Sequence, residues 1–136
     1  ADKREGDGAT PIGAWPLRRL LWRADRLARP HTRLECRPIR PQDAWCDAPG
    51  DADYNRMVEL PFGKSAEHLS RGDGLYDLII PLGYNDVSPI PGAGSAIFLH
   101  VARSDYAPTQ GCVALEINDL RHMIAGAGSG DRLLVT

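Results

Sequence analysis

The sequence predicts a mostly β fold with a minor helical part. The 14 glycines and 11 prolines among 136 residues indicate many turns, which divide the chain into short apolar runs. The two strongest runs, residues 76–84 and 96–101, have the length and composition of strands. Only residues 118–125, late in the chain, show helical spacing. We therefore expect several short strands and one late helix.

The length and net charge of the chain limit the kinds of protein that it can be. We expect a single domain over residues 1–136. The net charge of −2 supplies no basic field for nucleic acid. No apolar run approaches the roughly 18 residues that cross a bilayer, so we expect no membrane span in this chain. The chain begins at Ala1 without a targeting segment, which we interpret as a mature or trimmed product. The oligomeric state stays open.

The first part of the chain favours strands and loops. Residues 1–10 are polar and predict a turn. Pro16 argues against a helix through 12–23, so we expect an edge strand broken near that proline. Residues 24–53 carry four prolines and predict mostly loop, with one short strand near 37–40.

The middle of the chain predicts two strands and one helical turn. Residues 57–60 read as a short strand, and Ser65 suits the cap of a helical turn over 65–69. The run 76–84 predicts a strand in which Pro81 marks an edge or a bulge.

The last third of the chain predicts a strand, a helix and a strand. A loop over 89–94 leads into the strand 96–101. Asn118 is a plausible cap for the helix 118–125, which Gly126 ends. A final strand follows at 131–136.

One histidine and one cysteine carry the strongest chemical signal. His100 ends a buried strand, and Thr109-Gln110-Gly111-Cys112 follows within one loop. A thiol is a nucleophile as thiolate, and an adjacent histidine lowers the pKa of a thiol. Gly111 permits a tight turn whose N–H groups point at an oxyanion, and a carbonyl near Val101 would orient the histidine. The pattern predicts acyl transfer, with Cys112 as nucleophile and His100 as base.

Other interpretations of these residues stay open. By spacing alone, a core histidine and a buried apolar cysteine are the more common occurrence. The histidines and cysteines show no C-x-x-C or H-x-x-x-H spacing, so we expect no metal. The glycines at 126, 128 and 130 do not fit a dinucleotide loop, and we expect no cofactor. Cys36 and Cys46 either bridge each other or remain reduced.

Two motifs resemble those of the YkuD-type L,D-transpeptidases of bacterial cell walls. One is the strand-borne His100 followed by the [ST]-x-G-C motif at 109–112; the other is Gly8-Ala9-Thr10-Pro11-Ile12-Gly13-Ala14-Trp15. The resemblance covers most of the chain and is closest to a small-protein branch, with counterparts at 45–47, 54–56, 67–69, 82–86 and 111–115. It implies a mixed β-sandwich or barrel with a helix after the nucleophile.

The resemblance implies a reaction on peptidoglycan stem peptides, which act as donor and acceptor. Cys112 would attack a tripeptide–D-residue bond, and an amine of a neighbouring stem would resolve the acyl-enzyme as a 3–3 or 1–3 link. The site would then lie in the periplasm or cell envelope. Gln110 and Ala114 replace the family's usual His and Arg or Asn, and the loop between 100 and 109 is short. A carboxypeptidase or cross-link hydrolase on this scaffold, and a non-catalytic wall-binding module, are the alternatives.

Polar side chains within the matched stretches are candidates for binding the stem peptide. Arg56 is suited to a bidentate pair with a stem carboxylate. For each candidate the alternative is structural: a surface ion pair, a core ring or a turn former. The other candidates are Tyr54, Asn55, His68, Tyr84, Asn85, Thr109 and Gln110.

Overall fold

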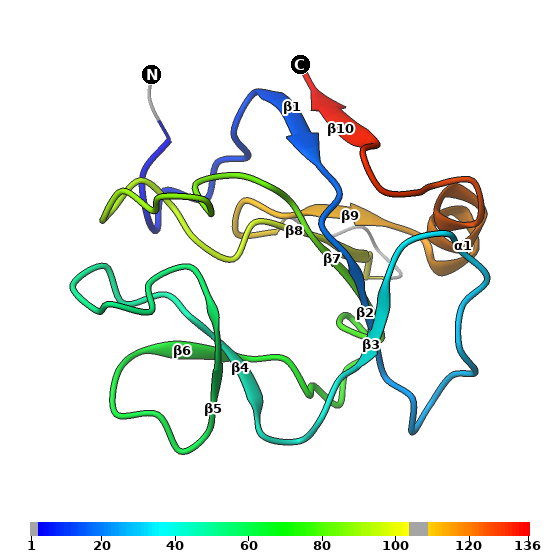
Figure 1. Ribbon diagram of the computed structural model, residues 1–136, viewed down its shortest axis with the longest axis horizontal. Coiled ribbons are helices and arrows are strands. Elements are labelled where there is room, and N and C mark those ends of the chain that lie inside the picture. The colour runs from blue at the N-terminus through cyan, green and yellow to red at the C-terminus, as the bar shows by residue number, and fades with distance from the viewer. Residues whose placement is uncertain (1–2, 104–108) are drawn as a thin grey trace.

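The computed structural model describes residues 3–103 and 109–136. This part of the chain forms three β-sheets and one helix, which confirms the predicted mostly β class (Figure 1). The largest sheet has the order β3-β2-β7-β8-β9. Its strands are β2 (Leu20–Trp22), β3 (Cys36–Pro38), β7 (Leu78–Pro81), β8 (Phe98–Val101) and β9 (Val113–Leu115).

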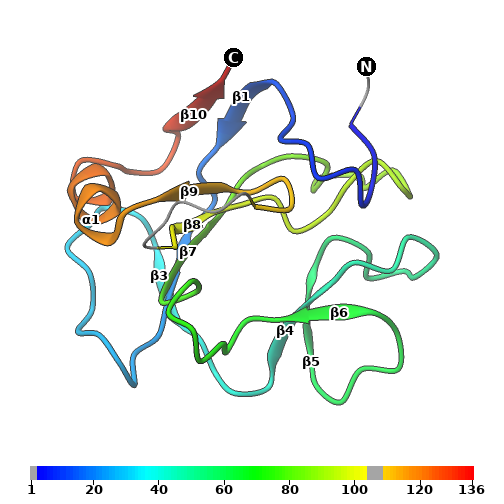
Figure 2. The same cartoon turned by 180° about the vertical axis from the view of Figure 1, so that it is seen from behind.

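The two smaller sheets flank this large sheet. The three-stranded sheet has the order β5-β4-β6 and lies below the large sheet, at the lower left of Figure 1 and at the lower right of Figure 2. The remaining strands pair antiparallel as β1 with β10. The bounds are β1 Gly13–Pro16, β4 Asp43–Cys46, β5 Met57–Glu59, β6 Ala66–His68, β10 Arg132–Val135 and the helix α1 Ile117–Ala125.

The three inner strands of the large sheet, β2, β7 and β8, are buried on both faces, which explains their apolar sequence. Side chains alternate across a strand, so neighbouring residues enter different cores. On β7, Leu78 and Ile80 join one cluster with α1, whereas Ile79 joins a second cluster with Trp45 of β4. Phe98 of β8 also lies in the second cluster. By the same alternation, His100, two positions after Phe98, faces the three-stranded sheet.

Several strands differ from the sequence prediction. Residues 66–68 form β6 instead of part of a helical turn, because they pair with β4. Strands β4 and β9 were not predicted, since each is three or four residues long and lacks a sustained apolar run. The predicted single strand over 12–23 is two strands, and β2 is an interior strand instead of an edge.

Pro81 lies in the central strand of the large sheet, not at its edge. It is the last residue of β7, where the proline lacks an N–H but its carbonyl accepts from Arg18 N at 3.1 Å. The strand end, rather than a sheet edge, therefore accommodates this proline.

The helix and the cysteines add two corrections. Helix α1 is capped by Glu116 rather than Asn118: the Glu116 carboxylate accepts from the N–H groups of Asn118 and Asp119. Gly126 ends the helix as predicted, with its N–H bonded to the last turn. Cys36 and Cys46 are free, so the bridged alternative is wrong for this structure.

Candidate active site

His100 lies on an interior strand of the large sheet, and the backbone carbonyl of the next residue orients its ring. It lies on β8, on the same face as Phe98, and is 5% exposed. Nδ1 of the ring lies 2.8 Å from the carbonyl oxygen of Val101, the contact expected from the sequence. Because a carbonyl only accepts, Nδ1 carries the hydrogen. Nε2 therefore keeps its lone pair and is the nitrogen available as a base.

Cys112 sits immediately before β9, the parallel neighbour of β8. Its thiol donates to the carbonyl oxygen of Ala96 at 3.3 Å. Ala96 itself has φ +54°, a left-handed conformation that is strained for a residue with a Cβ. The hydroxyl of Thr109 donates to the Cys112 carbonyl oxygen at 2.5 Å and so fixes the turn as expected.

The two sequence motifs meet at Gly111. Its φ of +93° is in the left-handed region, and a Cβ there would lie 2.8 Å from the carbonyl oxygen of Ala9. Ala9 belongs to the motif of residues 8–15, in which Trp15 Nε1 donates to the Pro11 carbonyl oxygen at 2.9 Å. The amino-terminal segment thus packs on the turn of residues 109–112, which we call the nucleophile turn, and only glycine fits between them.

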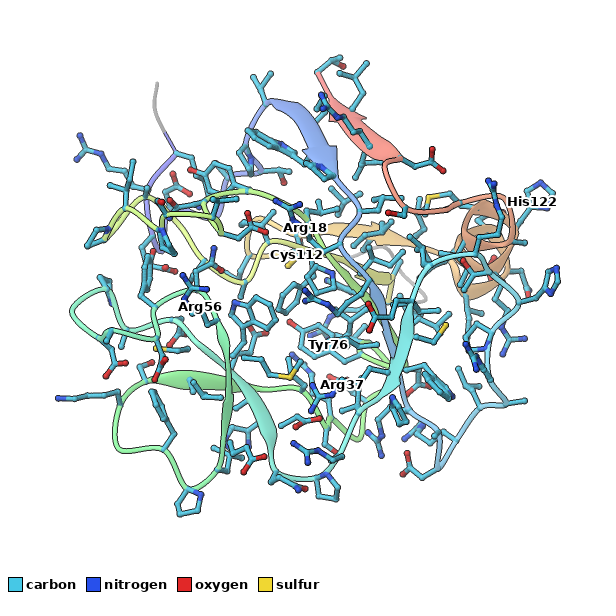
Figure 3. The ribbon with its side chains drawn as sticks, viewed as in Figure 1. Arg18, Arg37, Arg56, Tyr76, Cys112 and His122 are labelled. Carbon is cyan, nitrogen blue, oxygen red and sulfur yellow. The ribbon has the colours of Figure 1, made fainter. Side chains whose placement is uncertain are left out.

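His100 and Cys112 open into one cavity of about 420 Å³. Figure 3 shows Cys112 and Tyr76 near the middle of the molecule, with His122 at the outer end of α1. The walls come from the amino-terminal segment, the three-stranded sheet, the segments before β7 and β8, and the nucleophile turn. The lining residues are Lys3, Glu5, Gly6, Asp47, Glu67, Arg71, Leu75, Tyr76, Ser95, Ala96, His100, Arg103, Thr109, Gln110, Cys112 and Ala114.

The resting charge state differs from the one expected for an activated cysteine. Burial raises the pKa of Cys112 to about 12, and the nearby Glu67 carboxylate acts in the same direction. Burial also lowers the pKa of His100 below its ordinary value. At neutral pH the pair is a thiol beside a neutral imidazole. In this structure burial thus raises the pKa of the Cys112 thiol, opposite in direction to the lowering that an adjacent histidine was expected to cause.

An aromatic row supports the histidine. The ring of Tyr76 packs edge-on against His100, with centroids 5.3 Å apart, and against Phe98 at 5.8 Å. Trp45 continues the row on the other side of Phe98 at 5.1 Å. The Tyr76 hydroxyl donates to a carboxylate oxygen of Glu67. This row fixes the imidazole plane and connects it to the three-stranded sheet.

Asn55, a predicted substrate contact, is instead a buried structural residue. Its Oδ1 accepts from Trp45 Nε1 at 2.9 Å and from Ala96 N at 3.1 Å. Its Nδ2 donates to the carbonyl oxygens of Tyr84 and Asn85, at 3.1 and 2.7 Å. The amide has no hydrogen left for a substrate. It holds Ala96, whose carbonyl receives the Cys112 thiol.

The other predicted binding residues divide into two groups. Thr109 and Gln110 line the cavity, as their place beside Cys112 suggested. Five do not line it. Tyr54 is buried, and its hydroxyl donates to Glu5 at 2.7 Å and accepts from Gly94 N at 3.0 Å. Arg56 and His68 are exposed, and the Tyr84 and Asn85 side chains bond to loop carbonyl oxygens.

Most of the cavity lining was not predicted as functional, including Asp47, Glu67, Arg71 and Tyr76. Asp47 and Glu67 stand in stretches that match the family, but a lone carboxylate in a short strand resembles any solvated residue in sequence. The signal that was available is their position beside apolar residues that pack inward. The loop residues 104–108, part of the shortened loop, lie outside the described residues.

Comparison with known proteins gives one match. A family model described as YkuD, L,D-transpeptidase catalytic domain, matches residues 2–135. No curated protein and no solved structure matches the chain. Within residues 3–103 and 109–136, no helix is long and apolar enough to cross a membrane.

Proposed function

The chain belongs to the YkuD family of L,D-transpeptidase catalytic domains, and from this premise we propose that Cys112 and His100 catalyse acyl transfer on peptidoglycan stem peptides. The observation that carries the proposal is the shared cavity of about 420 Å³, which is lined by Cys112 and by His100, the histidine whose Nδ1 bonds to the Val101 carbonyl oxygen and whose Nε2 keeps its lone pair. A core histidine and a core cysteine would not open together into a cavity.

The first half-reaction forms the acyl-enzyme. Cys112 Sγ attacks the carbonyl carbon of the bond before a D-residue as His100 Nε2 takes the thiol proton. The imidazolium then gives this proton to the leaving amine, and the D-amino acid departs. The Val101 carbonyl oxygen stabilises the imidazolium through Nδ1–H, in the role that a carboxylate has in other triads. Burial of the thiol means that its ionisation and its attack are coupled.

The second half-reaction passes the acyl group to an amine. An amine of a neighbouring stem attacks the thioester, and Cys112 leaves. The acceptor is the side chain of a diamino residue, which yields a 3–3 link, or the α-amine of the first stem residue, which yields a 1–3 link. Gln110 and Ala114 replace the family's usual rim residues, and both line the cavity, which favours an acceptor other than the common one. Peptidoglycan places this activity in the periplasm or cell envelope.

Mass spectrometry of products tests the proposal. The native chain is incubated with purified stem muropeptides, and Cys112→Ala is the matched control. We expect a covalent adduct on Cys112 and cross-linked dimers, both lost in the variant. Hydrolysed monomers without dimers would favour the hydrolase. Equal wall binding by both chains, with no adduct on the native one, would favour the binding module.

A further inference from the structure

The three-stranded sheet brings two carboxylates to the cavity of Cys112. Glu67 lies on β6 and Asp47 directly follows β4, and both line the cavity. In the antiparallel register, Glu67 is paired with Trp45, two residues before Asp47. Residues two apart on a strand share a face, so Asp47 and Glu67 are diagonal neighbours on one face.

Glu67 is in electrostatic contact with the catalytic pair. Its carboxylate accepts from the hydroxyl of Tyr76, whose ring packs on His100. The negative charge of Glu67 is also one cause of the raised pKa of Cys112. Burial raises the pKa of Glu67 itself, which makes it a stronger base than an exposed glutamate. Glu67 is thus a base that Tyr76 holds in the wall of the cavity that Cys112 also lines.

Asp47 supplies an independent sign of a ligand. Its Oδ1 is buried and has no hydrogen-bond partner in the described part of the chain. A buried, unpaired carboxylate oxygen is costly, and it is satisfied when a ligand brings an N–H group. The cavity lining also holds the cationic Lys3, Arg71 and Arg103, but Asp47 and Glu67 give one wall an acidic part that suits an ammonium, which brings three such groups.

We propose that Glu67 is a further catalytic residue: it takes the first proton from the acceptor's ammonium, which Asp47 helps to bind beside the Cys112 thioester. The inference rests on the proposed function. It names the acceptor as an amine that arrives protonated, and it gives the three-stranded sheet the role of acceptor site.

The proton balance closes with two bases. The acceptor enters as R–NH₃⁺ and gives one proton to the Glu67 carboxylate. The neutral amine attacks the thioester carbonyl carbon, forming the new C–N bond, and gives its second proton to His100 Nε2. The C–S bond then breaks, and the imidazolium returns that proton to the Cys112 thiolate. Glu67 releases its proton to solvent, so the products are the amide, the free thiol and one proton.

This arrangement also distinguishes an amine from water. A protonated amine is unreactive until it loses a proton, but it is attracted to the two carboxylates. Water gains nothing from this charge. Glu67 therefore favours transfer over hydrolysis once the acyl-enzyme has formed.

The partition of the acyl-enzyme tests the inference. Glu67→Gln keeps the shape of the side chain and removes the base. Glu35→Gln, an exposed glutamate outside the cavity lining, is the matched control. We expect Glu67→Gln to lower the dimer-to-hydrolysis ratio at least about 10-fold, since a positioned base contributes about 10²–10⁴-fold. The ratio is taken per acyl-enzyme formed, so a change in the rate of adduct formation on Cys112 does not enter it.

A weakly basic acceptor gives a chemical rescue. Hydroxylamine is largely uncharged at neutral pH and needs no base to become reactive. We expect Glu67→Gln and the native chain to release the acyl group to hydroxylamine at similar rates. An equal loss with hydroxylamine and with the stem amine would overturn the role of Glu67 as base.

Tyr76→Phe provides a second test that keeps the fold. The Tyr76 hydroxyl favours the charged form of Glu67 and so lowers its pKa. Without the hydroxyl, the acid limb of the dimer-to-hydrolysis ratio moves to higher pH, whereas the ring on His100 remains. An unmoved limb, or an unchanged ratio in Glu67→Gln, overturns the inference alone, because the Cys112 adduct still forms. A native chain without the adduct overturns the proposed function and the inference together.

Discussion

The two sides of the catalytic cavity are built from different kinds of sheet. On one side, β8 is a strand of the five-stranded sheet, and all four of its residues are buried between β7 and β9. On the other side, β6 is a three-residue edge strand of the smaller sheet, and its residues are half-buried or exposed. The first side carries His100, and Cys112 stands directly before its strand β9. The second side carries Glu67.

This difference separates bond chemistry from acceptor recognition. A histidine on a buried interior strand keeps its orientation, because neighbours on both sides pair its backbone. Charged side chains cannot be placed there without partners, whereas a half-buried edge strand accepts carboxylates beside water. We infer that the large sheet sets how the acyl group is formed and that the small sheet sets what receives it.

The largest effect is expected from His100→Ala. At neutral pH we expect Cys112 acylation to fall about 10²–10⁴-fold, since the variant lacks its general base. The pH dependence of the rate also differs between the native chain and the variant. Burial lowers the pKa of His100, so the native rate rises with pH only below the ordinary histidine range and is then flat. The variant rate keeps rising towards the thiol pKa of about 12. Stopped-flow alkylation across pH measures both rates. A native rate with the same pH dependence as that of the variant would contradict the assignment of a neutral thiol and a neutral imidazole to Cys112 and His100.

Gly111→Ala is expected to have the next largest effect. The new Cβ meets the Ala9 carbonyl oxygen at 2.8 Å in a left-handed conformation, so the nucleophile turn must move away from the amino-terminal segment. We expect a loss of about 1–3 kcal/mol in the free energy of unfolding and an acylation rate lower by about 10²-fold. Chemical denaturation and adduct kinetics measure the two losses. Gly50→Ala, where a Cβ meets nothing within 4 Å, is the control.

The large-sheet side was largely predictable from the sequence. The apolar runs of β7 and β8 identify buried strands, and His100 with Gly111-Cys112 forms a local pattern that a single chain reveals. The charge state of Cys112 was not predictable, because the pKa of its thiol depends on burial by segments distant in sequence. Motif spacing contains no information on that burial.

The small-sheet side was mostly missed for a physical reason. Strand β4 lies among prolines and charges, and β6 begins after Ser65, so local signals favour a loop and a helical turn. Pairing between them overrides these signals. Asn55 was read as a substrate contact because an exposed asparagine and a buried, fully bonded one are identical in sequence.

Asn55→Ala tests whether the two sides are coupled. Asn55 comes from the small-sheet side, but its Oδ1 accepts from Ala96, which positions Cys112. We expect a loss of about 2 kcal/mol in the free energy of unfolding and an alkylation rate lower by about tenfold. Asn85→Ala is the control, since Asn85 has a similar positive φ but its side chain bonds to Ile90 and Gly94 of its own loop. Equal rates in the Asn55 and Asn85 variants would show that the sides act separately.

The smallest effect is expected from Arg56→Ala and His68→Ala. Both residues belong to the small-sheet side, but they are exposed and do not line the cavity. If acceptor recognition depends on the cavity wall itself, removal of these side chains changes KM for a single stem peptide by less than about threefold, within the range of exposed charge pairs. Steady-state kinetics with isolated stem peptides measure this, and Glu67→Gln supplies the comparison from the same sheet. A KM raised by tenfold or more in Arg56→Ala, with kcat unchanged, would extend the acceptor site beyond the cavity to the outer surface of this sheet and restore Arg56 as a carboxylate contact.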